Sequence, residues 1–216
     1  DCVFMDIPPD SVKIGMVSGE KTIQAIAAKL RQYGAKHVVM DPVMVSTSGT
    51  RLLSEAGREA LLEELLPLVA LMTPNLPEAQ VLSGLPVETE GDMLRAAREI
   101  SRLCRGAVLI KGGHLSGDAA DLLYQEGKAV WFRTRRISNP NTHGTGCTLS
   151  SAIACGLAAG YQLEESVRRA KAYLTGALSA GLDLGRGSGP LDHTYRMRLD
   201  GKSIDTLFEH VTDKTK

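Results

Sequence analysis

Strand-like and helix-like segments alternate along most of this 216-residue chain, and the alternation limits the possible folds more than any other feature. The strand-like segments are short apolar runs, whereas the helix-like segments repeat apolar residues every three or four positions. The expected order is strand 11–16, helix 19–33, strand 37–41, helix 54–66, strand 69–72, helix 92–104, strand 107–110 and, later, helices 145–159 and 164–181. This order predicts an α/β fold whose mainly parallel sheet is covered by helices on both faces.

One pair of strand-like runs departs from the alternation. Residues 121–125 and 129–133 are separated only by Glu126-Gly127-Lys128, which predicts a hairpin added to the sheet in antiparallel orientation. With 43% hydrophobic residues the chain can bury one sizeable core. We therefore expect residues 1–216 to form a single domain, with 200–216 as a flexible tail.

Charge and cysteine content argue against several classes of protein. Lys plus Arg and Asp plus Glu number 25 each, so no wide basic surface for nucleic acid is expected. No apolar run reaches the roughly 18 to 20 residues that a membrane-spanning helix needs. The four cysteines, at positions 2, 104, 147 and 155, show no metal-ligand spacing. Reduced thiols in a cytoplasmic protein fit this pattern best.

A glycine-bracketed turn runs from Asn141 to Thr148 and leads into a segment of small residues. Gly144 and Gly146 allow close approach of the backbone, so that N–H groups at a helix start can converge on an anion, most obviously phosphate. Cys147 lies in the first turn, where the positive end of the helix dipole favours the thiolate. Cys147 could thus act as a base or nucleophile, although an ordinary turn beside a buried cysteine has the same sequence.

Polar residues follow the strand-like runs, where ligands of open α/β sheets bind. Asp41 and Glu78 carry hard oxygen donors that could hold Mg²⁺. Alternatively, Asp41 caps a turn before Pro42, and Glu78 starts a helix. Lys111 precedes two glycines and could meet phosphate, or it could simply be solvated.

Lys171 lies on the apolar stripe of its helix, together with Val167, Leu174 and Leu178. A lysine in this place needs a physical reason. Its side chain could extend past the stripe to solvent, or its charge could face an anion in the cleft. The spacing alone does not separate these alternatives.

Four blocks, in this order along the chain, resemble the hydroxymethylpyrimidine/phosphomethylpyrimidine kinases of thiamine biosynthesis. They are residues 41–44 (DPVM), 73–79 (TPNLPEA), 108–114 (VLIKGGH) and 143–148 (HGTGCT), and residues 170–173 and 189–193 extend the resemblance. The resemblance covers about residues 11–193 and implies a ribokinase-like fold. It also implies ATP-dependent phosphorylation of hydroxymethylpyrimidine and then of its monophosphate, and a homodimer.

The resemblance also implies roles for individual residues. Cys147 stands where the wider ribokinase-like family carries a catalytic aspartate, so it would take the proton of the substrate hydroxyl as the γ-phosphoryl group of ATP arrives. Further expected roles are an anion hole from Gly144, Thr145 and Gly146; ATP binding by Lys111, Thr145, Gly146 and Lys171; Mg²⁺ binding by Asp41 and Glu78; and a pyrimidine pocket lined by Met16 and Val43.

The opening βα region of the family, with its glycine-rich loop and pyrimidine contacts, is missing from these 216 residues. We therefore expect an exposed apolar sheet edge, and either further residues before Asp1 in the protein or an inactive chain. Two alternative functions remain at this stage. One is pyridoxal kinase activity on the same fold, and the other is a non-catalytic nucleotide-binding module.

Overall fold

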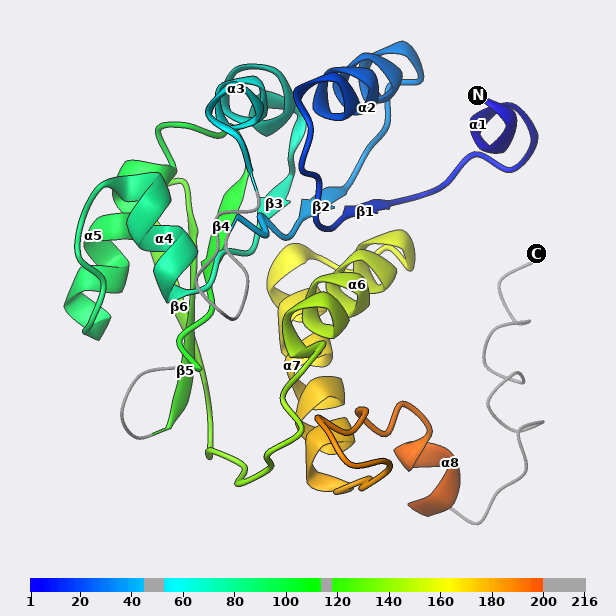
Figure 1. Ribbon diagram of the computed structural model, residues 1–216, viewed down its shortest axis with the longest axis vertical. Helices are drawn as coiled ribbons and strands as arrows, with labels where there is room; N and C mark the ends of the chain where they lie inside the picture. The colour runs from blue at the N-terminus through cyan, green and yellow to red at the C-terminus, as the bar shows by residue number, and fades with distance from the viewer. Residues whose placement is uncertain (45–52, 114–117, 200–216) are drawn as a thin grey trace.

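A six-stranded sheet lies between two layers of helices in the computed structural model, which describes residues 1–44, 53–113 and 118–199 (Figure 1). The strands follow the order of the sequence: β1 (Val12–Ile14), β2 (Val38–Met40), β3 (Leu71–Met72), β4 (Ala107–Ile110), β5 (Ala119–Gln125) and β6 (Lys128–Thr134). Strands β1 to β4 are parallel, and β5 and β6 are antiparallel. The predicted α/β architecture with an added hairpin is confirmed. The predicted tail, 200–216, and His114 of the 108–114 block lie outside the described residues.

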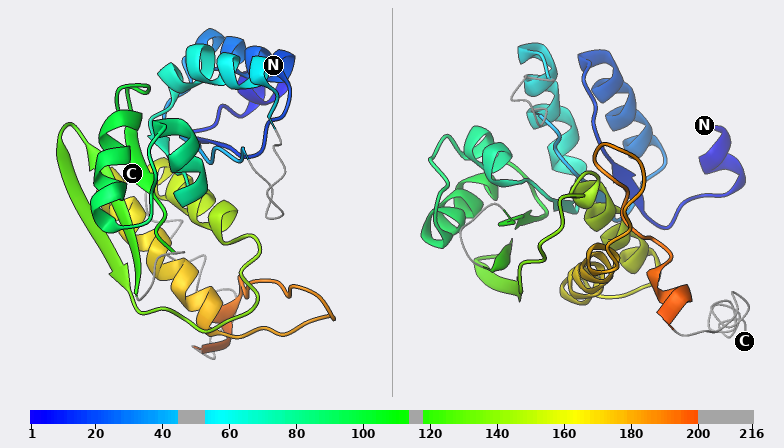
Figure 2. Two further views of the ribbon diagram at one scale, coloured as in Figure 1. Left: turned by 60° about the vertical axis from the view of Figure 1, so that its left-hand side comes forward. Right: turned by 60° about the horizontal axis from the view of Figure 1, so that its bottom comes forward.

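The helices divide between the two faces of the sheet (Figure 2). One face carries α2 (Glu20–Gln32), α3 (Glu55–Ala60), α4 (Leu76–Ser83) and α5 (Glu90–Ile100), and the other carries α6 (Thr145–Ala158) and α7 (Leu163–Ser179). Short helices, α1 (Cys2–Asp6) and α8 (Tyr195–Leu199), lie near the ends of the described chain.

Successive residues of the central strands supply the two halves of the core. In β2, Val38 and Met40 pack with α2 to α5, whereas Val39 packs with α6 and α7. This arrangement follows from the alternation of side chains along a strand, and it explains why the strand is apolar at every position. Both faces of the sheet must therefore be covered for the chain to be stable.

The segment predicted as one helix over 54–66 is helical, but its winding changes twice. Helix α3 is followed by a π-helical turn, η1 (Leu61–Leu65), and a 3₁₀ turn, η2 (Leu66–Leu68). The N–H of Leu66 bonds to the C=O of Leu61, five residues back. Pro67 has no N–H, and in a regular α-helix its ring would collide with the C=O of Glu63, so the regular winding cannot continue through it.

The parallel strands end at one edge of the sheet, and backbone hydrogen bonds continue past their ends. The N–H of Asp41 bonds to the C=O of Ile14 at 2.9 Å, and the N–H of Thr73 bonds to the C=O of Met40 at 2.9 Å. Lys111 forms an isolated parallel bridge with Asn75. The polar residues after the strands are therefore held by the sheet itself. On its other side, β1 pairs with no further strand among the described residues.

Gly106, directly before β4, provides a test of this packing. A Cβ at this position would lie 2.3 Å from the C=O oxygen of Val69 and 2.4 Å from that of Ala70, and backbone atoms cannot move aside easily. We expect Gly106→Ala to lower the free energy of unfolding by about 3 kcal/mol. Gly91→Ala is the matched control: it lies in α5 with no atom closer than 3.7 Å to the new Cβ, and it should raise stability by roughly 0.5–1 kcal/mol. Urea denaturation measures both, and equal effects would contradict the packing described.

Candidate active site

The first turn of α6 is open to an incoming anion. Gly144 occupies the N-cap with a φ of 83°, a left-handed conformation that favours glycine, and its helix start has no side-chain cap. The first N–H groups of a helix have no partners within the helix. The sequence predicts that Gly144, Thr145 and Gly146 bind an oxyanion. The N–H of Thr145 already donates to the C=O of Thr142 at 3.3 Å, whereas in the described residues the N–H groups of Gly146 and Cys147 make no such bond and remain able to bind an anion. The Thr145 hydroxyl donates to the C=O of Thr142 at 2.9 Å.

A buried ion pair lies directly against this turn. Lys111 Nζ lies 2.6 Å from Asp41 Oδ1, and the Asp41 side chain is almost fully buried. Thr73 Oγ1 donates to the same carboxylate oxygen at 3.3 Å. A Cβ on Gly146 would stand 3.1 Å from Lys111 Nζ and 3.4 Å from Asp41 Oδ2. The absence of a side chain at Gly146 thus allows the helix start to touch the pair.

Glu78 lies in the first turn of α4, where it forms a capping box with Asn75. The Asn75 N–H donates to Glu78 Oε2 at 2.8 Å, and the Glu78 N–H donates to Asn75 Oδ1 at 2.9 Å. The alternative in which Glu78 starts a helix is therefore correct. The residue is also buried, with an exposed fraction of 3%. Burial raises the pKa of Glu78 to about 7, while the Lys111 charge and the Asn75 N–H oppose this rise and the Asp41 carboxylate adds to it.

The Asp41 carboxylate adds to the rise in the pKa of Glu78, so the two negative charges disfavour each other. Across the described ranges of the chain, no group of three or more His, Cys, Asp or Glu side chains could enclose a metal ion. The two carboxylates could therefore hold Mg²⁺ only together with water or phosphate oxygens, which is its usual coordination beside nucleotides.

Lys171 is buried on α7 and pairs with Asp121 of β5. Lys171 Nζ lies 2.6 Å from Asp121 Oδ2 and donates to the C=O of Ala119 at 3.0 Å. The alternative in which the lysine extends to solvent is thus wrong, and its charge faces an anion of the protein itself. The sequence analysis did not identify Asp121 as a site residue. A carboxylate between the apolar residues Ala120 and Leu122 of a buried strand was the signal that could have found it.

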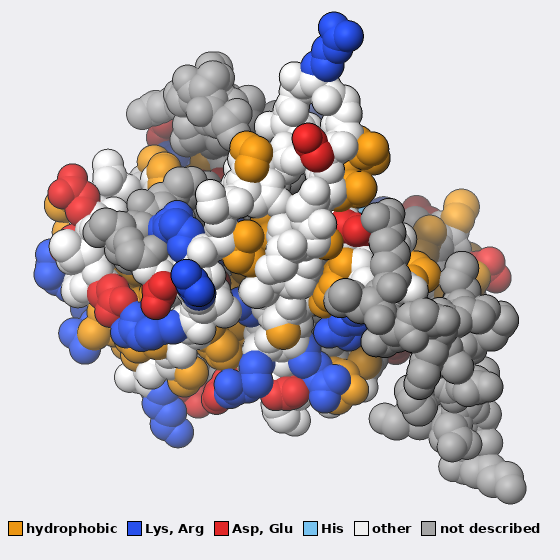
Figure 3. Space-filling model, turned by 90° about the horizontal axis from the view of Figure 1, so that it is seen from below, with side chains coloured by type: hydrophobic (Ala, Val, Ile, Leu, Met, Phe, Trp, Pro, Cys, Tyr) orange, Lys and Arg blue, Asp and Glu red, His pale blue; other side chains and the backbone are white. Residues whose placement is uncertain are grey.

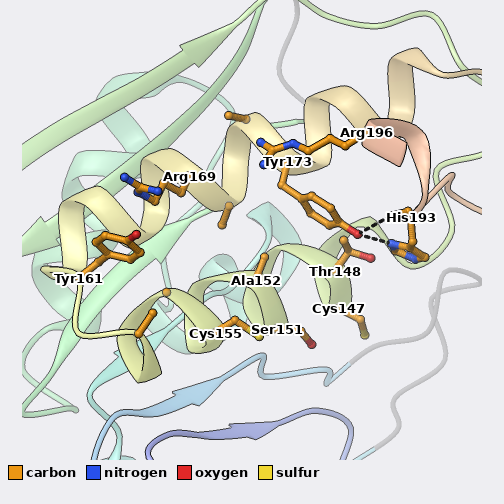
Figure 4. A pocket seen from close by; sticks show the side chains of 14 residues that line it. Cys147, Thr148, Ser151, Ala152, Cys155, Tyr161, Arg169, Tyr173, His193 and Arg196 are labelled. Atoms are coloured by element: carbon orange, nitrogen blue, oxygen red, sulfur yellow. Dashed lines mark hydrogen bonds between the residues drawn. The ribbon is translucent and has the colours of Figure 1, made fainter. Parts of the chain in front are cut away.

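The start of α6 separates two hollows. A cavity of about 400 Å³ lies on the sheet side. Its lining includes Lys111, Asp121, Thr145, Gly146 and Lys171. A groove of about 740 Å³ runs between α6 and α7. Figure 4 shows Cys147 at one end of this groove, with Tyr173 of α7 hydrogen-bonded to His193 beside it.

The remaining predicted residues lie at the same end of the sheet, but outside these two hollows. Met16 follows β1 and is 61% exposed, and Val43 follows β2 and is partly buried. Neither residue lines the cavity or the groove. Cys147 itself is exposed, so its thiol is accessible to a substrate. The structure thus brings together Asp41, Lys111 and Gly146, whereas Met16 and Val43 line neither hollow.

A family model described as phosphomethylpyrimidine kinase matches residues 1–192 of the chain. The chain belongs to the phosphomethylpyrimidine kinase family. The resemblance stated from the sequence is therefore confirmed, and with it the ribokinase-like fold. The chain is 50% identical over 204 residues to the hydroxymethylpyrimidine/phosphomethylpyrimidine kinase of Rhizobium meliloti. The aligned region covers 93% of this chain and 76% of that protein.

Two further similarities show how far the comparison extends. The thiamine biosynthesis bifunctional protein ThiED of Geobacter sulfurreducens is 48% identical over 194 residues, which are 89% of this chain and only 40% of that longer protein. The structure of Staphylococcus aureus pyridoxal kinase in complex with AMP-PCP superposes with a TM-score of 0.81 at 34% identity, covering 88% of this chain and 70% of that one. The fold is thus shared with a pyridoxal kinase.

The helices and the surface charge of this chain can be compared with what its sequence predicts. None of the helices in the described part of the chain is both long and apolar enough to cross a membrane. On the face seen in Figure 3, Lys and Arg side chains stand beside Asp and Glu side chains, without a continuous patch of one charge. This mixture is consistent with the equal numbers of acidic and basic residues in the sequence.

The raised pKa of Glu78 makes stability depend on pH. Its pKa is about 7 in the folded chain against a usual value of 4.5, so the folded state loses stability as the pH rises from 4.5 through 7. Glu78→Gln does not titrate. The unfolding free energy of the natural chain minus that of the variant should therefore fall by roughly 3 kcal/mol between pH 4.5 and pH 8 in metal-free buffer.

Urea denaturation at several pH values measures this difference. Glu63→Gln, which replaces an exposed carboxylate, is the control and should give a profile parallel to that of the natural chain. Parallel profiles for Glu78→Gln as well would show that burial does not disfavour the Glu78 carboxylate.

Proposed function

We propose that this chain uses ATP to phosphorylate hydroxymethylpyrimidine and then the resulting monophosphate, giving the pyrophosphate for thiamine biosynthesis. One observation carries the proposal: in a member of this family, the Asp41–Lys111 pair lies against Gly146 at an uncapped helix start. Phosphoryl transfer depends mainly on positioning and on neutralisation of charge. A helix N-terminus beside a lysine supplies both.

We assign the phosphates of ATP to the cavity of about 400 Å³. Its size lies within the range of small-molecule sites. The N–H groups of Gly146 and Cys147 would stabilise the negative charge on the transferring group, and Thr145 lines the same cavity. Lys111 and Lys171 line the same cavity and would neutralise the phosphate oxygens.

We assign Mg²⁺ to the carboxylates of Asp41, which follows β2, and Glu78, in the first turn of α4. Both are buried, and burial raises the pKa of Glu78 because it disfavours the charged carboxylate. A bound Mg²⁺ would supply positive charge there and neutralise the phosphates. Lys111 balances the charge of Asp41 at a distance of 2.6 Å.

We assign the base to Cys147, in the turn beside the anion hole. Its sulfur would take the proton from the substrate hydroxyl, whose oxygen then forms the new bond to the γ-phosphorus as the bond to ADP breaks. Met16 and Val43, which follow β1 and β2, are assigned to the pyrimidine pocket. We also propose a homodimer and a cytoplasmic location. The free cysteines are consistent with the location, and the edge of β1, which pairs with no further strand among the described residues, is consistent with the dimer.

Pyridoxal kinase activity is the competing function, because the S. aureus pyridoxal kinase shares the fold at a TM-score of 0.81. The higher identity to the R. meliloti kinase, 50% against 34%, favours the pyrimidine substrate. Parallel turnover assays with hydroxymethylpyrimidine and pyridoxal test the choice. We expect the pyrimidine to give the larger kcat/KM. Faster turnover of pyridoxal would reverse the assignment, and ADP binding without turnover of either would indicate a nucleotide-binding module.

The assignment of the base predicts unequal effects on the two phosphorylation steps. The first acceptor is a neutral hydroxyl that must lose a proton, whereas the second is a phosphate that is already anionic. Cys147→Ala should therefore slow the first step by roughly a hundredfold or more and the second by much less. Cys155→Ala, two turns further along the same helix and also exposed, should leave both steps unchanged.

Separate assays with each purified acceptor measure the two rates. Equal losses for both steps in Cys147→Ala would show that the residue contributes to nucleotide binding or folding rather than to proton transfer.

A further inference from the structure

Asp121 is a buried carboxylate for which neither a helix cap nor the proposed metal site gives a reason. It lies within β5 and is 7% exposed, between Ala120 at 2% and Leu122 at 0%. A carboxylate in such a place is costly in free energy unless charge and hydrogen bonds compensate it. Its contacts should therefore reveal what it does.

Both oxygens of Asp121 are used, and they hold groups from two different parts of the chain. Oδ1 accepts the backbone N–H of Gly112 at 3.0 Å, and Oδ2 accepts from Lys171 Nζ at 2.6 Å. Gly112 follows β4, whereas Lys171 lies within α7. The Asp121 carboxylate thus connects the turn after β4 to helix α7. Asp121 and Lys171 both line the cavity assigned to ATP.

The turn after β4 rests directly on β5. A Cβ on Gly112 would stand 1.9 Å from the C=O oxygen of Ala120, so only glycine allows this approach. Lys111, the preceding residue, forms the ion pair that touches Gly146. The hydrogen bond from Gly112 to Asp121 therefore lies one residue from the lysine that faces the helix start.

Lys171 is held in a defined direction by the same contacts. An ammonium group has three N–H donors. In the described part of the chain, two of them meet acceptors, one on Asp121 and one on Ala119. The third is available to a phosphate oxygen in the cavity, which Lys171 lines.

We propose that Asp121 is a positioning residue of the nucleotide site, which fixes the Lys171 ammonium and the Gly112 N–H at the cavity wall and so determines nucleotide affinity. This inference rests on the proposed function, in which Lys171 binds the phosphates of ATP. Without the carboxylate, the ammonium would be buried without a counter-charge and would leave its position. The nucleotide would then lose the contact.

A double-mutant cycle on the full chain tests the inference. Asp121→Asn keeps an oxygen that can accept the Gly112 N–H but removes the charge, and Lys171→Met removes the ammonium. The readout is the dissociation constant of ADP with excess MgCl₂, measured by calorimetry, together with the split between KM for ATP and kcat. We expect each single variant to raise the dissociation constant and KM about tenfold, with kcat changed less than threefold. The double variant should bind no more weakly than Lys171→Met alone.

The double variant and a control variant separate a loss of positioning from a loss of structure. The double variant leaves no unpaired buried charge, so it should fold even if Asp121→Asn is unstable. Asp92→Asn is the matched control: Asp92 is also buried and accepts the Thr89 N–H at 2.8 Å as part of the α5 capping box. Asp92→Asn should lower the melting temperature without changing the dissociation constant of ADP.

The outcomes distinguish the inference from the proposed function. An effect of Lys171→Met with none from Asp121→Asn, or additive effects in the double variant, would overturn the positioning role of Asp121 alone. No effect of Lys171→Met would contradict the role of this lysine in ATP binding, and the inference would fall with it. The expected cycle in a chain that phosphorylates neither pyrimidine would support the inference and overturn the proposed reaction.

Discussion

The ion pair between Asp41 and Lys111 connects the three parts of the molecule on which the site depends. Asp41 follows β2, Lys111 follows β4, and Gly146 of α6 lies so near both side chains that a Cβ there would contact them. The pair is nearly buried, so it holds its geometry only if the strand ends and the helix start are correctly placed. Conversely, the contact holds the first turn of α6 at the carboxyl ends of the strands.

A second pair, Asp121 with Lys171, repeats this arrangement on the other side of the cavity. In both cases a buried aspartate pairs with a lysine that lines the cavity to which we assign phosphate. Because the ion pairs already fix the two lysine side chains, these side chains lose little entropy when an anion binds. The acids also reduce the positive charge of the empty cavity, so that the folded chain tolerates two lysines close to a helix N-terminus. Preorganisation of this kind is what phosphoryl transfer requires.

Much of the fold could be predicted because its signals are local. The apolar strands, including β4 at residues 107–110, and the helical periodicity of α5 are legible within about ten residues each. Capping residues also act locally, as Asn75 and Thr89 do at the starts of α4 and α5. The change of winding between Leu61 and Leu68 was missed, although Pro67 lay in the sequence, because apolar periodicity dominates the pattern there.

The sequence alone determined the order of strands and helices, the polar residues at the strand ends and the glycine turn at 141–148, since these depend on near neighbours in the chain. It also determined family membership, through blocks that keep their order. Only the tertiary structure decided which acid meets which lysine. Lys111 is 70 residues from Asp41, and Lys171 is 50 residues from Asp121. Such partners are set by the order of strands in the sheet and by the packing of α6 and α7 against it, which no local pattern specifies.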